Sequence, residues 1–172
     1  VVGENGLKEL ETVCWVLDIC NAKVNDSCGF HVHMDAAGFN LDTWKNLTLT
    51  YKHLEHLIDA FMPRTRRNNT YCKTLSGVSD ERIKSVRTID GLREVFNNDR
   101  YHKVNFEAYS RHRTVEFRQH SGTTNFTKME NWIRFLNGLI TFAKRSSLPS
   151  RMTLEELPFL DGKQRSEEHT SE

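Results

Sequence analysis

The chain lacks both a long hydrophobic run and an excess of one charge. No apolar stretch in its 172 residues approaches the roughly 20 residues that a membrane-spanning helix needs. The 24 basic residues nearly cancel the 23 acidic ones. This balance gives no electrostatic reason to expect binding to nucleic acid or to a membrane surface. We therefore expect neither of these as a partner.

Cysteine is also scarce, and the cysteines form no Cys-x-x-Cys pair. The four are Cys14, Cys20, Cys28 and Cys72. Without a paired spacing, they are best interpreted as small buried thiols of a protein in a reducing compartment. We therefore expect a cytoplasmic protein.

The composition is that of one folded domain. Hydrophobic residues make up 37% of the chain and charged residues 27%, which is typical of a globular protein. The last eight residues, 165–172, resemble the translated start of a sequencing-library adapter, so we assign residues 1–164 to the domain. Because the chain opens with Val1 rather than Met, directly before a helix, we expect that an upstream part of the domain is missing.

Hydrophobic periodicity predicts an α+β domain, an antiparallel sheet with helices packed on one face. A long helix begins after the N-cap Asn40 and ends before Pro63. A later helix begins at a capping box from Thr127 to Glu130. The expected helices cover 5–20, 41–61, 80–86, 89–97, 127–143 and a short turn after Thr153, and the expected strands cover 28–36, 104–109 and 113–120.

Two of the expected strands have unusual polar faces. Because successive side chains of a strand point to opposite sides, each segment divides into an apolar row and a polar row. In 28–36 the apolar row is Phe30, Val32, Met34 and Ala36, and the polar row is Gly29, His31, His33 and Asp35. In 113–120 the apolar row is Val115 and Phe117, and the polar row is Thr114, Glu116, Arg118 and His120. Imidazoles, carboxylates and a guanidinium in place of the usual Thr, Ser or Lys indicate an active-site sheet.

These polar rows suit metal and phosphate chemistry. His31 and His33 can converge on one cation, or on a cation and its phosphate ligand. Glu116 is the candidate carboxylate ligand, and Arg118 is placed for bidentate contact with phosphate. Zinc would normally need three or four nitrogen or sulfur ligands, whereas Mg²⁺ or Mn²⁺ prefers oxygen ligands and nucleotide phosphates. We therefore expect Mg²⁺ or Mn²⁺ to bind together with a nucleotide.

Four neighbouring polar residues leave two interpretations open. Asp35 can belong to the polar row or cap the turn that follows it, and His120 can hydrogen-bond to the backbone at the end of its strand. Arg113 is expected to face away from Glu116 unless a bulge intervenes, and Arg111 can reach over the sheet.

The loop after the long helix is rich in arginine. Arg64, Arg66 and Arg67 could clamp phosphates or an acidic substrate, although loop arginines are more often simply solvated. Of these, Arg66 and Arg67 are our candidate nucleotide contacts. His53 and His56, on the long helix itself, are expected on the surface.

Together these motifs resemble the amidoligase family of carboxylate–amine ligases, which is related to glutamine synthetase and glutamate–cysteine ligase. The resemblance covers roughly residues 5–145. It is carried by Cys28-Gly-Phe-His-Val-His-Met-Asp35, Arg113-Thr-Val-Glu-Phe-Arg-Gln-His-Ser-Gly-Thr123, Trp132-Ile-x-Phe135, and Phe61-Met-Pro-x-x-Arg66-Arg67-Asn68 before Tyr71-Cys72. Glutamine synthetases have a similar Gly-x-His-x-His strand and a later Glu-x-Arg strand, so the resemblance implies a partial glutamine synthetase-like catalytic core.

The resemblance implies an ATP-dependent reaction. A substrate carboxylate takes the γ-phosphoryl group, and an amine attacks the acyl phosphate to give an amide. His31 and Glu116 would be metal ligands, His33 a contact to nucleotide phosphate, and Arg118 a contact to the transferred phosphate. The implied cofactors are ATP and Mg²⁺ (or Mn²⁺), and the implied partners are small-molecule or peptide carboxylates and amines. The relation to glutamine synthetase also allows a homo-oligomer with sites between subunits.

One departure from the superfamily pattern concerns its early Glu-x-Glu strand. Here Glu9 and Glu11 lie on the predicted helix 5–20, so the motif is not assigned to them and is expected upstream. Two other functions stay open: a metal-dependent hydrolase or phosphoesterase that uses the same His/His/Glu site, and a non-catalytic binding module. A strand with paired glutamates upstream would favour the ligase, and a further His/Asp cluster would favour the hydrolase.

Residues 1–164 alone are expected to show weak or absent amine-dependent release of ADP. Two imidazoles and one carboxylate neutralise a bound metal–nucleotide complex poorly, and Mg²⁺ is particular about its oxygen ligands. Restoring the native upstream segment should recover the activity. Measuring ADP formation by both forms with a panel of amines checks this, and robust amine-stimulated turnover by the short form would contradict it.

Overall fold

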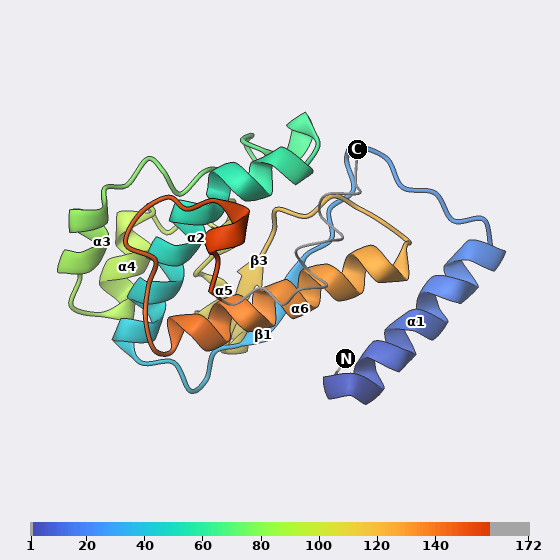
Figure 1. Ribbon diagram of the computed structural model, residues 1–172, viewed down its shortest axis with the longest axis horizontal. Coiled ribbons are helices and arrows are strands. Elements are labelled where there is room, and N and C mark those ends of the chain that lie inside the picture. Colours follow the sequence, from blue (N-terminus) through green and yellow to red (C-terminus); the bar gives the residue numbers. More distant parts are fainter. Residues whose placement is uncertain (1, 159–172) are drawn as a thin grey trace.

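The computed structural model describes residues 2–158, in which helices pack against a three-stranded antiparallel sheet (Figure 1). The strands, in the spatial order β1-β3-β2, are β1 (Val32–Asp35), β2 (Val104–Asn105) and β3 (Thr114–Phe117). The helices are α1 (Gly3–Ile19), α2 (Leu41–Phe61), α3 (Asp80–Ser85), α4 (Ile89–Val95), α5 (Ala108–His112) and α6 (Phe126–Ala143), with 3-10 turns at Arg64–Arg66 and Leu154–Glu156. The predicted α+β class is confirmed. The suspected adapter-derived tail, 165–172, lies outside the described residues.

Helix α2 forms the centre of the core, and both its ends lie where the sequence predicts them. Asn40 caps the N-terminus because its side chain accepts a hydrogen bond of 2.8 Å from the Thr43 backbone N–H. The helix ends at Phe61 because Pro63 has no N–H and restricts Met62 to an extended conformation. Its large buried side chains, each contributing about 1.5–3 kcal/mol by leaving water, include Trp44, Leu47, Tyr51, Leu54 and Ile58.

One face of the sheet packs on this helical layer. Val32, Phe117 and Val104 are aligned across the three strands and are all buried. The Tyr51 ring of α2 lies 5.8 Å from the Phe117 ring between centroids, and α6 packs against α2 (Figure 1). The alternate residues of β1 and β3 therefore point to the opposite face of the sheet, as the sequence pattern predicts.

The regular strands are shorter than predicted, but their backbone pairing continues past β1 and β3. The Phe30 N–H donates to the His120 carbonyl oxygen at 3.0 Å, and the Gly122 N–H donates to the Cys28 carbonyl oxygen at 2.9 Å. Gly122 is required there, since an added Cβ would lie 2.4 Å from the Cys28 Cβ. The two polar rows thus stay in register beyond the strands themselves.

The predicted strand over 104–109 is wrong after its first two residues. The Asn105 side chain accepts a hydrogen bond of 2.9 Å from the Glu107 backbone N–H, which turns the chain into the short helix α5. This helix ends at His112, and its C-cap Arg113 has a φ of 56°, in the left-handed region. A helical turn rather than a three-residue loop therefore joins β2 to β3.

The capping box predicted for α6 is also wrong. The helix begins at Phe126, two residues after Thr124, and the Asn125 side chain caps it by accepting 3.0 Å from the Lys128 backbone N–H. Asn is as good an N-cap as Thr, and Asn125 and Thr127 both lie where the helix can begin, so the sequence alone does not choose between them. The N-cap predicted at Thr127 is thus two residues late.

The cysteines match the expectation only in part. All four are free, but Cys20 is exposed and Cys28 is half-buried. The burial that the sequence led us to expect for all four is found only for Cys14 and Cys72.

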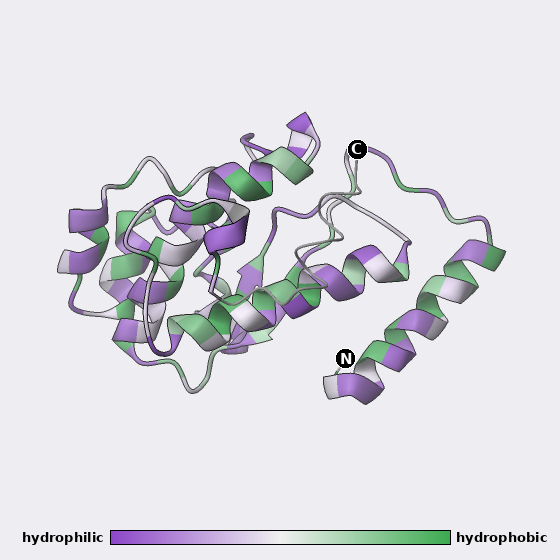
Figure 2. Cartoon of the chain, viewed as in Figure 1, coloured by the Kyte–Doolittle hydropathy of each residue, from purple (hydrophilic) through white to green (hydrophobic). Residues whose placement is uncertain are grey.

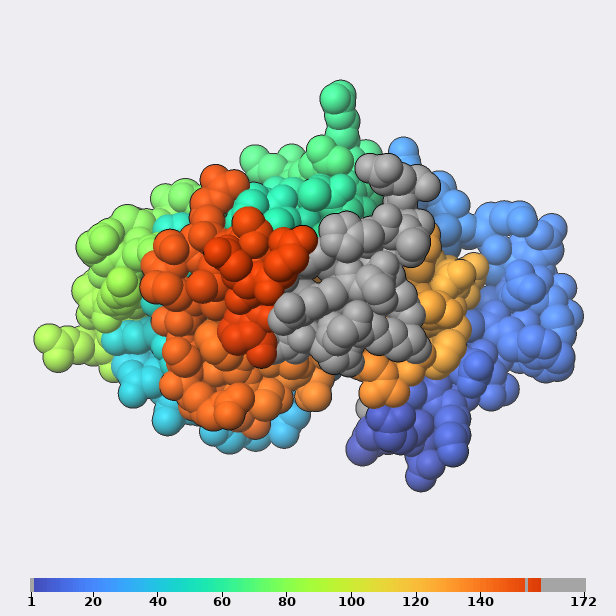
Figure 3. All heavy atoms as spheres, viewed as in Figure 1, coloured from blue at the N-terminus to red at the C-terminus, as the bar shows by residue number. Residues whose placement is uncertain are grey.

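Helix α1 lies at one end of the molecule beside the start of α6 (Figure 3). Cys14 Sγ lies 3.6 Å from Met129 Sδ, and Glu4 pairs with Arg134 at 2.9 Å and 3.0 Å. Figure 2 shows hydrophobic and hydrophilic residues alternating along α1 after its first turn. Those on its exposed side are Val13, Trp15, Val16 and Ile19. Within residues 2–158, α1 and the other helices are too short or too polar to cross a membrane.

The histidines of α2 are not on the surface, contrary to the prediction. His53 is buried, with Nε2 2.7 Å from Asp80 Oδ2 and Nδ1 2.7 Å from the Leu148 carbonyl oxygen. Lys52 Nζ lies 2.6 Å from the other Asp80 oxygen. His56, half-buried, lies against the chain that follows α6. Asp80 therefore joins α2 to the start of α3.

Asp80→Asn should destabilise the fold at neutral pH and lose this effect in acid. Burial raises the pKa of the Asp80 carboxyl, but hydrogen bonds from Lys52 and His53 outweigh it and lower the pKa below its usual value. A lowered pKa stabilises the fold above the unfolded pKa of about 4, and the stabilisation is lost as the pH falls through the folded pKa. We expect a cost of about 1–2 kcal/mol at pH 7.

Urea denaturation at pH 7 and at pH 3 measures this difference. Asp26→Asn, at an exposed position, is the matched control and should change stability little at either pH. A cost for Asp80→Asn that is equal at both pH values would contradict the expectation.

Candidate functional site

The polar face of the sheet gathers the predicted residues around one carboxylate oxygen. His33 of β1 lies opposite Glu116 in the strand register. Glu116 Oε1 lies 2.9 Å from Arg118 Nη1, 3.2 Å from His31 Nδ1 and 3.7 Å from His33 Nε2. The four side chains therefore share one face, as the alternation predicts.

Glu116 carries a negative charge at neutral pH. Its side chain is only 7% exposed, and this burial raises the pKa of the carboxyl. Hydrogen bonds from His31 and Asn105 and the positive charge of Arg118 more than offset burial, and they lower the pKa to about 2. The face thus presents a fixed anion surrounded by donors.

Asn105 of β2 is a member of this site that the sequence reasoning missed. It lies opposite Glu116 in the register, and its Nδ2 donates to Glu116 Oε2 at 2.6 Å. Its amide orientation is set, because its Oδ1 accepts the hydrogen bond from the Glu107 N–H. The predicted hairpin, with its loop at 110–112, would have placed Phe106 opposite Glu116, whereas aligning the apolar Val104 with Phe117 would have placed Asn105 there. The signal was therefore the match between the apolar residues of the two strands.

The two imidazoles present different nitrogens to Glu116. His33 Nδ1 lies 2.9 Å from Thr114 Oγ1, so Nε2 faces the site. His31 presents Nδ1. Their side chains are 42% and 33% exposed, so both are reachable by a ligand. His112, at the end of α5, meets the His33 ring edge-on at 5.8 Å. Sequence reasoning missed His112, because it placed this residue in a hairpin loop.

The Arg118 side chain is also contacted by the two loops that contain Tyr71 and Tyr101. Its Nε lies 3.5 Å from the Tyr71 carbonyl oxygen, and its guanidinium carbon lies 5.5 Å from the centre of the Tyr101 ring. Within residues 2–158 the polar contacts of this guanidinium use Nε and Nη1, which leaves Nη2 for a ligand.

The two candidate arginines of the loop after α2 are not part of this cluster. Arg66 is buried, and its guanidinium donates to the carbonyl oxygens of Gln119 and Arg118. Arg67 is exposed and its Nε donates to the Met62 carbonyl oxygen at 2.8 Å. Arg66 therefore supports the backbone at the end of β3, while Arg67 keeps the rest of its guanidinium at the surface.

Asp35 and His120 adopt the structural alternatives. Asp35 Oδ1 accepts 3.0 Å from the Ala37 backbone N–H and so caps the turn after β1. His120 Nδ1 lies 2.7 Å from the Ser121 carbonyl oxygen, and its ring packs edge-on against Phe30. Burial lowers the pKa of this imidazole.

The arginines around α5 lie outside the cluster as well. The Arg113 guanidinium lies 4.5 Å from the centre of the Tyr109 ring, and Arg111 is exposed on α5. Neither makes a contact with Glu116.

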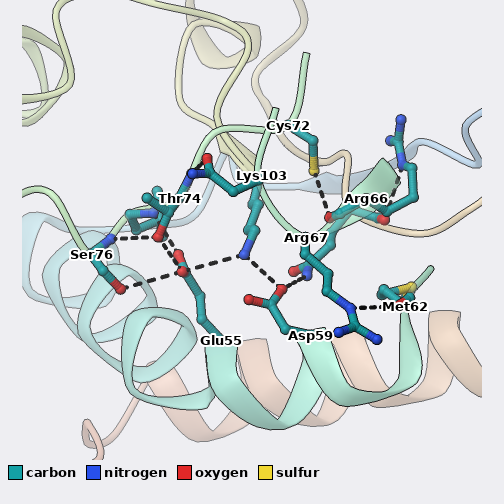
Figure 4. A network of polar contacts seen from close by, with 12 residues as sticks. Glu55, Asp59, Met62, Arg66, Arg67, Cys72, Thr74, Ser76 and Lys103 are labelled. Carbon is teal, nitrogen blue, oxygen red and sulfur yellow. Dashed lines mark hydrogen bonds and ion pairs between the residues drawn. The ribbon is translucent and has the colours of Figure 1, made fainter. Parts of the chain in front are cut away.

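A buried polar network ties the end of β3 to α2 (Figure 4). Lys103 is fully buried, with Nζ 2.7 Å from Asp59 Oδ1 and 3.4 Å from Glu55 Oε2. Asp59 Oδ1 also accepts from the Gln119 side chain at 2.5 Å. Removing one partner of such a buried pair typically costs about 3–5 kcal/mol. The network therefore fixes the backbone next to Arg118.

A metal ion on this face would have few protein ligands. Within the described residues no group of three His, Cys, Asp or Glu side chains is arranged to hold a metal ion. A zinc site needs three or four such ligands, whereas Mg²⁺ commonly takes one or two and completes its shell with phosphate oxygens and water. His31 and Glu116 therefore fit a metal that arrives with a nucleotide.

Gly29→Ala should displace the His31 ring. An added Cβ would lie 2.7 Å from His31 Nε2 and 2.9 Å from Arg66 Nη2, so both side-chain ends must move. We expect a loss of stability of about 1 kcal/mol and a shift of the His31 ring resonances by NMR. Gly38→Ala, where an added Cβ meets nothing within 4 Å, is the control. Unchanged His31 resonances in the first variant would show that the close approach is absent.

Comparison with protein families gives one match. The model of a family described as "Putative amidoligase enzyme" matches residues 1–140. Comparisons with curated proteins and with solved structures gave no significant match. The matched span contains all three strands and every residue that surrounds Glu116. Since it covers most of the chain, the chain belongs to this amidoligase family.

Proposed function

We propose that the protein is an ATP-dependent carboxylate–amine ligase, which forms an amide through an acyl phosphate. The observation that carries this proposal is the convergence of Arg118 and two imidazoles on the buried Glu116 carboxylate. Phosphoryl transfer depends on positioned cations and metal ligands rather than on covalent chemistry by the protein. Membership of the amidoligase family supports amide formation as the second half of the reaction.

Arg118 is the proposed contact to the transferred phosphoryl group. Negative charge spreads over the phosphoryl oxygens in the transition state, and a guanidinium held in place stabilises it without reorganisation. Glu116 and the Tyr101 ring hold Arg118 in advance, and Nη2 is left to meet the phosphoryl oxygens. The substrate carboxylate oxygen attacks the γ-phosphorus, and ADP leaves.

His33 is the proposed contact to nucleotide phosphate, and His31 and Glu116 are the proposed metal ligands. The exposed Nε2 of His33 lies beside the carboxylate, so both groups face the same ligand. Bound Mg²⁺ (or Mn²⁺) would supply neutralisation of the phosphate charge. The low pKa of Glu116 keeps that ligand ionised.

The proposed substrates are small-molecule or peptide carboxylates and amines. In the second step the amine nitrogen attacks the acyl carbon, phosphate leaves, and the nitrogen loses a proton. Arg66 and Arg67 stay candidate nucleotide contacts. Arg67 has the more accessible guanidinium of the two, because Arg66 is buried against backbone carbonyls.

Glu116→Gln in the full-length protein should lower amine-stimulated, metal-dependent ATP turnover by roughly 10²-fold or more, as expected for a lost charge at a phosphoryl-transfer site. The amide has nearly the same shape, so the circular dichroism spectrum should be unchanged. Glu9→Gln, on the exposed surface of α1, is the matched control and should turn over normally.

ADP release with and without amine provides the measurement. Near-normal turnover by Glu116→Gln would remove this carboxylate from the reaction. Metal-dependent hydrolysis by the unmodified protein that needs neither ATP nor amine would identify a hydrolase or phosphoesterase instead.

A further inference from the structure

The loops behind Arg118 carry an aromatic and cationic surface that the roles above do not use. It consists of Tyr71, Tyr101 and Arg100, which we call the tyrosine platform. Tyr71 is 61% exposed although it adjoins a buried guanidinium. Large exposed aromatic side chains beside a polar site are typical of ligand contacts.

The exposed Tyr71 ring belongs to a well-anchored loop. Its backbone N–H donates to Asn69 Oδ1 at 2.7 Å, and Asn69 pairs with Cys72 in an isolated bridge. The next residue, Lys73, donates its backbone N–H to the Tyr101 carbonyl oxygen at 2.7 Å. The two loops of the tyrosine platform are therefore fixed to each other.

The tyrosine platform combines open aromatic surface with cations. The Tyr71 and Tyr101 rings meet edge to face, with centroids 5.6 Å apart and planes at 85°. The guanidinium carbons of Arg100 and Arg118 lie 5.4 Å and 5.5 Å from the centre of the Tyr101 ring. Arg100 is exposed, and within residues 2–158 no carboxylate forms an ion pair with it.

We propose that the tyrosine platform binds the base of a nucleoside triphosphate, with Tyr71 stacked on the base and Arg100 in contact with a phosphate. This inference rests on the proposed use of ATP and names the residues that recognise it. An exposed aromatic face binds a planar base favourably by stacking, and the neighbouring guanidiniums form charge-assisted hydrogen bonds with the anionic phosphates.

The charges of the tyrosine platform argue against the other two substrates. A protonated amine would be repelled by the exposed guanidinium of Arg100. A simple carboxylate would pair with the guanidiniums but would leave the Tyr71 ring exposed to water. A base that carries phosphates can both stack on the Tyr71 ring and pair with the guanidiniums.

Calorimetric binding of ATP and of inorganic tripolyphosphate to the full-length protein, each with Mg²⁺, separates base from phosphate recognition. Tyr71→Ala should raise the Kd for ATP by about 5- to 100-fold, the range for one lost stacking contact. It should leave tripolyphosphate binding unchanged, and Tyr71→Phe should keep most of the ATP affinity. Trp15→Ala, which removes an equally exposed aromatic from α1, is the matched control and should change neither. Arg100→Gln should weaken both ligands.

Equal weakening of ATP and tripolyphosphate by Tyr71→Ala, or no weakening of either, would overturn the tyrosine platform as a base site. The ligase proposal is judged separately by amine-stimulated ADP release. Selective loss of ATP affinity in Tyr71→Ala without any such release would support the base site and reject the ligase. Amide formation with ATP binding that is insensitive to Tyr71→Ala would do the reverse.

Discussion

The buried carboxylate of Glu116 is the constraint on which the candidate site depends. It stands on the central strand, so β1 and β2 both supply partners to it. A buried charge without partners costs several kcal/mol, and here Arg118 and Asn105 meet it from different directions. Each partner is itself held by other contacts. The positions of the site residues are therefore consequences of satisfying one anion.

The chain just after β3 is also stabilised by buried polar contacts, on the side that faces α2. Three short strands provide few backbone hydrogen bonds, and past Phe117 the pairing continues only through separate backbone hydrogen bonds outside the regular strands. Lys103 compensates by binding two carboxylates of α2, and Gln119 joins the same network. Arg66 adds hydrogen bonds to the backbone between these points. The direction of the Arg118 side chain is thus fixed by polar contacts to the neighbouring backbone and by contacts of the guanidinium itself.

The sequence predicted the features that depend on strict periodicity. A strand has a period of two, so the common face of His31, His33, Glu116 and Arg118 followed from alternation alone. Features that depend on contacts between distant segments could not be predicted. The burial of His53 depends on Asp80, 27 residues away, and no local pattern joins them. His112 was missed for another reason, since a single Asn side chain converts the end of a strand into a helix.

The pairing of Arg118 with Glu116 places a candidate anion contact directly beside a candidate cation ligand. An anion at the free Nη2 of Arg118 would lie next to a cation held by the Glu116 carboxylate, and the two ions would attract each other. Binding of either ion would therefore favour binding of the other, and by thermodynamic linkage the gain would be reciprocal. A site of this kind would prefer ligands of opposite sign that arrive already joined.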